Sequence, residues 1–164
     1  MNRDTNRGMA LSRSVIASLL LLASLIIAPS VAVACTCMAF PDDVAKAAAT
    51  AYAQADVIFL GTVTDIKTKR WQQPIGVRET TFELLDVWKG LSGRSAAVVS
   101  SAIGSLACGY KFDKPGEYLV FAYWDVERQI LTTSMCDLTR KASEANGLVR
   151  ELDKIKGGAG QSTR

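Results

Sequence analysis

The spacing of hydrophobic residues predicts a helix at the start of the regular part of the chain. Within residues 42–55, small and hydrophobic side chains recur at helical spacing: Val44, Ala47, Ala48, Ala51, Tyr52 and Ala55. Pro41-Asp42-Asp43 stands where this stretch begins, and a proline followed by early negative charge favours a helix start. We therefore predict a helix over 42–55.

Five short segments after this helix have the composition of β-strands, with β-branched residues and partial alternation of apolar and polar side chains. They are 57–66, 79–88, 96–100, 118–123 and 129–133. The polar segment 67–77 contains Pro74 and Gly76, which predicts a hairpin connection between the first two strands. A charged turn at 125–128 joins the last two strands.

The second predicted strand changes face halfway along its length. Phe82 and Leu84 share one face, whereas Leu85 and Val87 carry the apolar pattern to the other face. This change predicts a bulge or bend, of the kind that lets a sheet curl into a barrel.

The last regular element predicted is an amphipathic helix, followed by a flexible tail over 157–164. Its apolar residues are Ala145, Leu148, Val149, Leu152 and Ile155. Five strands with a helix near each end fit a mainly β fold, α+β overall: a small five-stranded Greek-key barrel of the OB type. A five-stranded sandwich is the rival, and periodicity alone does not separate the two.

The first 34 residues have the pattern of a secretory signal peptide. Arg3, Arg7 and Arg13 precede an apolar run at 15–27, which is shorter than the roughly 20 residues needed to span a bilayer. Small residues at 32–34 then suit cleavage by signal peptidase. We predict cleavage between Ala34 and Cys35, one domain over 35–156, and a protein that is secreted to the extracellular space or the periplasm.

Composition excludes several classes of function. The 164 residues include 19 Lys and Arg, 16 Asp and Glu, and no His. After the predicted cleavage, 16 basic residues remain against 15 acidic ones, a balance that speaks against nucleic-acid binding. Without His, the commonest zinc ligand and general base are missing, and no nucleophile–base pair or glycine-rich phosphate loop stands out. The sequence predicts no enzyme activity, no cofactor and no metal of its own.

The four cysteines, Cys35, Cys37, Cys108 and Cys136, predict disulfides, because an even number in an exported chain is typical of an oxidising compartment. Four cysteines allow three pairings, but Cys35 and Cys37 are poorly placed to pair with each other. Two long-range bridges are expected, each stabilising the domain by roughly 4–5 kcal/mol at most. A redox-active C-x-C is the alternative, with no evident group to lower a thiol pKa.

Cys35 has a second possible fate, because residues 32–35 faintly resemble a lipobox. Acylation would consume the Cys35 sulfur and leave one odd thiol, and Ala32 stands where a lipobox has a bulky residue. Both points favour ordinary cleavage. Lipidation of Cys35 remains the one route by which the protein would attach to a membrane.

Five motifs occur in order along the predicted domain. They are the C-x-C at 35–37, the stretch 82–90 with its closing Lys-Gly, C-G-Y at 108–110, the strand at 116–122, and the T-T ending at 132–136. Together they resemble the N-terminal inhibitory domain of the tissue inhibitors of metalloproteinases, in the netrin-like group of OB folds. The resemblance covers residues 35 to about 137.

This resemblance implies that Cys35 pairs with Cys108 and Cys37 with Cys136. It also implies an inhibitory edge formed by Cys35, Thr36 and Cys37. In the family, the free amine and carbonyl of the first cysteine chelate the catalytic zinc of a metalloendopeptidase, and the second residue enters a pocket of the protease. Catalytic zinc keeps an open coordination position, and an amine with a pKa of about 7.7–8.0 deprotonates to fill it. The zinc belongs to the partner.

A different function is consistent with the same residues. A C-x-C also serves to pin a chain end to a barrel, and netrin-like domains act as extracellular interaction modules that inhibit nothing. Trp71 with Lys67, Lys69 and Arg70 forms a second candidate contact patch, for which a solvated hairpin tip is the simpler interpretation.

Overall fold

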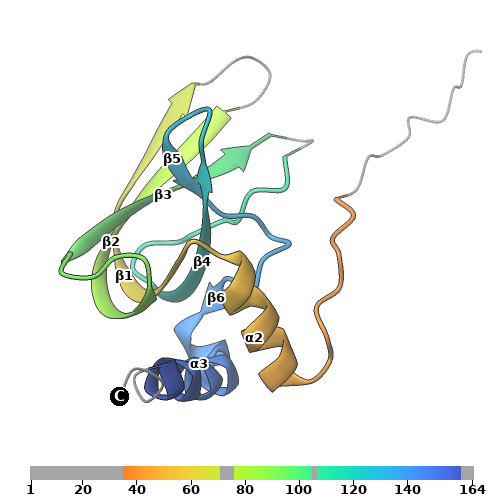
Figure 1. Ribbon diagram of the computed structural model, residues 1–164. Coiled ribbons are helices and arrows are strands. Elements are labelled where there is room, and N and C mark those ends of the chain that lie inside the picture. The colour runs from red at the N-terminus through yellow and green to blue at the C-terminus, as the bar shows by residue number, and fades with distance from the viewer. Residues whose placement is uncertain (1–34, 71–75, 105–106, 160–164) are drawn as a thin grey trace, which may run out of the picture. The chain divides into compact units, whose positions relative to one another are not determined.

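The computed structural model describes residues 35–70, 76–104 and 107–159, within a compact unit that spans Ala34–Arg164 (Figure 1). The predicted signal peptide and cleavage site lie outside these residues. The described part is mainly β, as predicted, with one mixed sheet and two α-helices. Its elements are α2 (Val44–Gln54), β1 (Val57–Arg70), β2 (Gly76–Lys89), β3 (Ala96–Ile103), β4 (Glu117–Asp125), β5 (Ile130–Thr132), β6 (Arg140–Lys141), the 3-10 helix η1 (Ala142–Glu144) and α3 (Asn146–Ala159).

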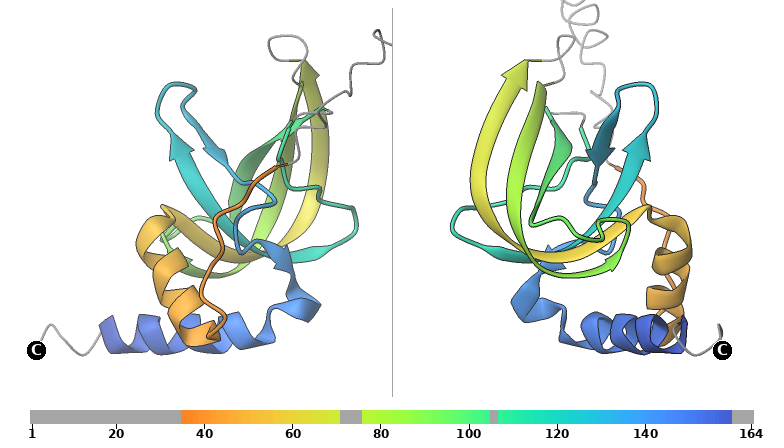
Figure 2. Two further views of the ribbon diagram at one scale, coloured as in Figure 1. Left: turned by 90° about the vertical axis from the view of Figure 1, so that its right-hand side faces the viewer. Right: turned by 60° about the vertical axis from the view of Figure 1, so that its left-hand side comes forward.

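The sheet closes on itself. Its hydrogen-bonded order is β1-β2-β3-β5-β4-β6, and β4 also pairs with β1, so five strands form a circuit. All pairings are antiparallel except that of β3 with β5, which meet in parallel at Ser100 and Thr132. The two views of Figure 2 show the sheet curving around its interior, with α2 and α3 at its base.

The bulge predicted in the second strand is confirmed. The β1–β2 register shifts between Leu60 and Gly61, where Leu85 is an extra residue on β2, and again between Ile58 and Phe59, where Trp88 is extra. Leu85 is exposed, whereas Trp88 is buried against the helices. Each extra residue increases the local twist of β2, which helps the sheet to close.

The prediction that 67–77 is a hairpin connection is wrong at both ends. β1 continues to Arg70 and β2 begins at Gly76, and residues 71–75 lie outside the described residues. The polar side chains there belong to paired strands, in which the exposed Lys69 contacts Glu79 across the pair at 2.7 Å. A polar ribbon that covers no core lacks the alternation by which a strand is recognised in sequence.

The predicted helices are confirmed, with small differences at their ends. Asp43 caps α2, since its Oδ1 accepts the Lys46 backbone N–H at 2.8 Å. α3 runs to Ala159, so the part of the expected flexible tail at 157–159 is helical, and 160–164 lie outside the described residues. The short strand β6 and the 3-10 helix η1 were not predicted.

β4 is the centre of the fold because it is buried on both faces. Tyr118, Val120 and Ala122 pack inside the closed sheet, in what we call the interior cluster. Leu119 and Phe121 alternate with them and pack toward the helices, in what we call the helix cluster. This double burial explains the continuous apolar sequence of β4, since successive side chains on a strand point to opposite faces.

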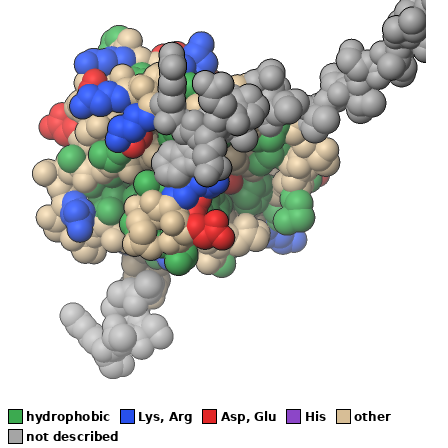
Figure 3. Space-filling view, turned by 90° about the horizontal axis from the view of Figure 1, so that it is seen from above, with side chains coloured by type: hydrophobic (Ala, Val, Ile, Leu, Met, Phe, Trp, Pro, Cys, Tyr) green, Lys and Arg blue, Asp and Glu red, His purple; other side chains and the backbone are tan. Residues whose placement is uncertain are grey.

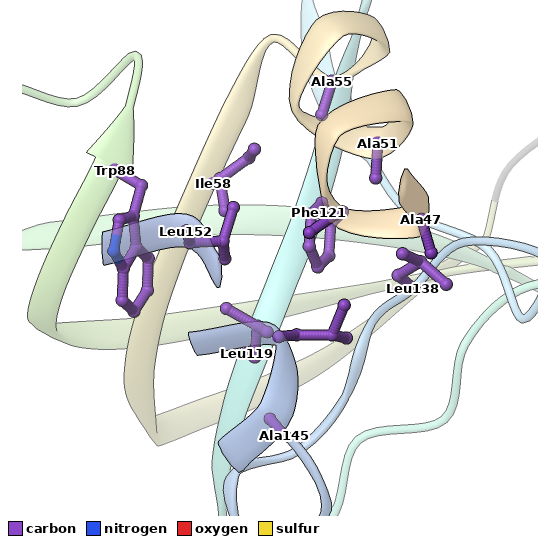
Figure 4. Packing of buried hydrophobic residues seen from close by; sticks show 12 residues of the cluster. Ala47, Ala51, Ala55, Ile58, Trp88, Leu119, Phe121, Leu138, Ala145 and Leu152 are labelled. Atoms are coloured by element: carbon purple, nitrogen blue, oxygen red, sulfur yellow. The ribbon is translucent and has the colours of Figure 1, made fainter. Parts of the chain in front are cut away.

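The helix cluster joins α2 and α3 to the sheet (Figure 4). α2 and its C-cap residue contribute small side chains, which lets the helix backbone approach the sheet closely: Ala47, Ala48, Ala51 and the C-cap Ala55. α3 contributes Leu148 and Leu152. The Trp88 indole packs beside Leu152 and donates its Nε1–H to the Asp153 carboxylate at 2.8 Å. The two helices therefore form a fixed base for the segment that precedes α2.

Replacing Ala48 with Leu tests this packing. Ala48 is fully buried, so extra methyl groups at this position should destabilise the fold by about 1–3 kcal/mol. Ala49→Leu is the matched control, because Ala49 is exposed on the same helix and should leave stability nearly unchanged. Urea unfolding of the two variants measures the difference, and equal stabilities would contradict the packing described here.

Candidate functional site

The chain segment that precedes α2 is held by two disulfides. Cys35 is bonded to Cys108 with their Cα atoms 5.9 Å apart, and Cys37 is bonded to Cys136 with their Cα atoms 5.1 Å apart. These are the pairs that the resemblance implies. They tie the segment to the loop after β3 and to the loop after β5. Two formed disulfides indicate an oxidising environment.

The two loops that receive the bridges lie against each other. The Met135 N–H donates to the Cys108 carbonyl at 2.8 Å, and Gly109 forms an isolated β-bridge with Ser134. Gly109 also lies directly on β3, where an added Cβ would overlap the carbonyl oxygen of Ala102. Glycine at 109 is therefore required for this close backbone approach.

Asp137 organises the loop after β5. Its Oδ2 accepts hydrogen bonds from the Ser134 backbone N–H at 2.6 Å, the Ser134 hydroxyl at 3.1 Å and the Thr133 hydroxyl at 3.3 Å. The Ser134 hydroxyl oxygen in turn accepts the Cys136 backbone N–H at 3.2 Å. One carboxylate thus fixes the loop that carries Cys136. Sequence analysis missed this role, although an Asp in a Ser/Thr-rich turn is a known signal for local hydrogen bonding.

The predicted inhibitory edge is accessible. Thr36 and Cys37 are exposed, and Cys35 is half-buried. Two large apolar side chains flank the bridge between Cys37 and Cys136: Met38 is 87% exposed and Met135 is 57% exposed. Each methionine exposes an adaptable apolar side chain next to one cysteine of the bridge, since the unbranched thioether adjusts to varied partners.

A cavity of about 310 Å³, which we call the edge hollow, opens beside Thr36 and Cys37. Its lining residues come from the N-terminal segment, α2, β4 and the Asp137 loop: Thr36, Cys37, Met38, Ala39, Phe40, Thr50, Gln54, Tyr123, Cys136 and Asp137. Burial, together with the nearby charges of Asp137 and Asp56, raises the pKa of Tyr123 to about 12. Burial also raises the pKa of Asp137, and the hydrogen bonds from Ser134 and Thr133 only partly oppose it.

The second candidate patch is only partly within the described residues. Trp71 lies outside them, and the side chain of Arg70 is not described. Lys67 and Lys69 each contact a carboxylate, at 3.1 Å from Asp65 and 2.7 Å from Glu79. Figure 3 shows Lys and Arg side chains interspersed with Asp and Glu on this end of the molecule, so the basic groups there do not form a patch of one sign.

The described residues contain no group of three or more His, Cys, Asp and Glu side chains placed to hold a metal ion. None of the helices within 35–70, 76–104 and 107–159 has the length and apolar character needed to cross a bilayer. Comparison with protein-family models and with curated proteins finds no match to this chain. The site is therefore interpreted from its own geometry.

Replacing Gly109 with Ala tests the loop packing behind the Cys35 bridge. The new Cβ must displace backbone atoms of Ala102, so we expect a loss of at least about 1–3 kcal/mol of stability. Gly158→Ala is the matched control, since a Cβ there would meet no described atom within 4 Å apart from its chain neighbours and its own helix backbone, and alanine favours a helix. Urea denaturation compares the two, and a neutral Gly109→Ala would contradict the close approach.

Replacing Asp137 with Asn tests the environment of this carboxyl group. Because the folded protein raises the pKa of Asp137, its contribution to stability is complete below the ordinary Asp pKa of about 3.9 and is lost as pH rises through the raised pKa. The wild type should therefore lose stability relative to Asp137→Asn over that window. Urea midpoints at a series of pH values measure this difference.

Asp125→Asn provides a control of opposite sign. Hydrogen bonds from Arg128 lower the pKa of Asp125, so its stabilising contribution is present above the ordinary Asp pKa and is lost as pH falls through the lowered pKa. A wild type that gains stability over Asp137→Asn as pH rises would show that Asp137 is not desolvated as described.

Proposed function

We propose that the closed sheet is a Greek-key barrel of the OB type, in the netrin-like group. Three observations support this assignment. Five strands form a circuit in the order β1-β2-β3-β5-β4, with β3 and β5 parallel. The second strand carries bulges where the sheet curls. Helices lie near both ends of the described chain, and the N-terminal C-x-C is bonded to the two loops that the resemblance names.

On this barrel, the function that the site supports best is inhibition of zinc metalloendopeptidases. After cleavage between Ala34 and Cys35, the α-amine and carbonyl of Cys35 would chelate the zinc of the protease, and Thr36 would enter its specificity pocket. The single observation that carries the proposal is that this short edge is accessible while each of its cysteines is bonded to a different loop.

The chemistry requires a free amine and a rigid edge. An amine with a pKa of about 7.7–8.0 is partly neutral near pH 7, and it can occupy the position that catalytic zinc leaves open for water. A chain end that is already fixed loses less conformational entropy when it binds. The bridges from Cys35 and Cys37 provide this fixation on both sides of Thr36.

A second function has its own supporting observation. Met38 and Met135 expose apolar surface beside the edge, which suits binding of a protein partner whether or not a zinc ion is present. On that alternative, the domain is a non-inhibitory extracellular interaction module. The experiment below separates the two, because only inhibition through zinc depends on the amine of Cys35.

The test compares two forms of the oxidised protein, one that begins at Cys35 and one with a single alanine added before Cys35. The first form should inhibit members of a panel of zinc endopeptidases. The second should lose inhibition, because its first amine is displaced and the Cys35 nitrogen has become an amide. Residual protease activity over a range of inhibitor concentrations is the measurement.

A third form, with one alanine added after Arg164, is the matched control and should inhibit as the first form does. Intact mass establishes in each sample that all four sulfurs are oxidised and that the N-terminus carries no acyl group. Equal inhibition by the two N-terminal forms, or inhibition by neither, would contradict zinc chelation and favour the interaction module.

A further inference from the structure

The edge hollow contains the Asp137 carboxylate, which has no cationic partner among the described residues. Its Oδ2 atom is occupied by the three hydrogen bonds from Ser134 and Thr133. Within the described residues, Asp137 Oδ1 forms no hydrogen bond, and no Lys or Arg forms an ion pair with either oxygen. A half-buried charge without a counter-charge is unfavourable, and a cation that reached it would relieve this.

The walls of the hollow suit an aliphatic chain that ends in a charge. Met38, Phe40, the Tyr123 ring and the bridge between Cys37 and Cys136 supply apolar surface. Thr50 and Gln54 add polar groups from α2. Lys and Arg bury their methylene stems on apolar surface and place the charged head on an acceptor. The volume of about 310 Å³ lies at the small end of the range for ligand pockets and accommodates one such side chain.

We propose that the edge hollow receives one lysine or arginine side chain of the protein that docks on the N-terminal edge. This rests on the proposed function only in taking the partner to be a protein bound at Cys35–Cys37. The proposed cation belongs to the partner, because no described Lys or Arg pairs with this carboxylate. Cys35, which would carry the amine freed by cleavage, is not among the residues that line the hollow. Because Oδ2 already accepts three hydrogen bonds, the incoming group bonds to Oδ1.

The hollow lies beside the edge, so a partner that engages Thr36 presents neighbouring residues to Asp137. Thr36 and Cys37 line the hollow themselves, together with Asp137. The subsite therefore selects among partners by the charge of the side chain that enters the hollow. Zinc chelation at Cys35 does not depend on this charge. Partners that place an acidic side chain there are disfavoured, since like charges repel most strongly where water is partly excluded.

The test uses two small probes and the oxidised protein labelled with ¹⁵N. The first probe is n-butylguanidinium and the second is n-butylurea, its neutral analogue of nearly equal shape. The guanidinium probe should shift the amide resonances of Gln54, Ser134 and Asp137 saturably, and bind at least about fivefold more tightly than the urea probe.

Three variants complete the experiment. Asp137→Asn keeps an oxygen for the Ser134 and Thr133 donors and removes the charge, so it should reduce binding of the guanidinium probe to that of the urea probe. Glu83→Gln is the control for loss of a negative charge, since Glu83 is exposed on β2 and does not line the hollow. Glu83→Gln should leave the preference for the guanidinium probe over the urea probe intact. Thr50→Leu fills the hollow from α2 without changing charge and should weaken binding of both probes.

Equal binding of the two probes to the wild type would overturn the proposal, as would a preference that persists in Asp137→Asn. If Asp137→Asn fails to fold, unchanged binding to Thr50→Leu would overturn it. These outcomes are distinct from those of the inhibition assay. Inhibition without a preference for the cationic probe removes only the subsite, whereas a preference without inhibition leaves the subsite on an interaction module.

Discussion

Two covalent bonds give the start of the described chain a fixed position. Residues 35–43 form no helix or strand, so their backbone contributes few hydrogen bonds of its own to the fold. The bridges from Cys35 and Cys37 join them to loops that are already held, one through Gly109 against β3 and the other through Asp137. The geometry of the edge therefore depends on the sheet and on one carboxylate, rather than on the extended segment itself.

The closed sheet and the two α-helices of the described residues together support the edge. β4 is shared by the interior cluster and the helix cluster, so the packing of α2 and α3 is continuous with the inside of the sheet. The segment after the edge leads directly into α2, and the bulge at Trp88 brings β2 into contact with α3 through Asp153. The edge is thus tied at one end by disulfides and at the other by a helix that is itself well packed.

Sequence analysis predicted the features that depend on local pattern. The alanine-rich helix, the strand expected at 118–123 and the change of face at Leu85 all have local causes, and the structure has α2, β4 and a β2 bulge at these positions. The length of the β1–β2 ribbon did not follow from the sequence, because its polar residues pair across strands and cover no core. β6 has only two residues, and its pairing with β4 arises from the tertiary fold.

The candidate site likewise has one part that follows from a local sequence pattern and one part that arises only from the tertiary fold. The C-x-C at Cys35–Cys37 is visible in the sequence because cysteines are rare and their spacing is specific. The edge hollow is assembled from four separate parts of the chain. No local sequence pattern therefore predicts that Tyr123 and Asp137 line it. Asp137 becomes distinctive only through its burial and the donors around it.

The placement of α3 has a practical consequence. This helix lies at the base of the sheet, and the orange ribbon that starts the described chain begins well away from it in both views of Figure 2. A tether attached behind α3 therefore starts on the helix side of the sheet rather than at the disulfide-bonded segment. Attachment on the α3 side is thus the geometry that best leaves the disulfide-bonded segment facing partners in solution.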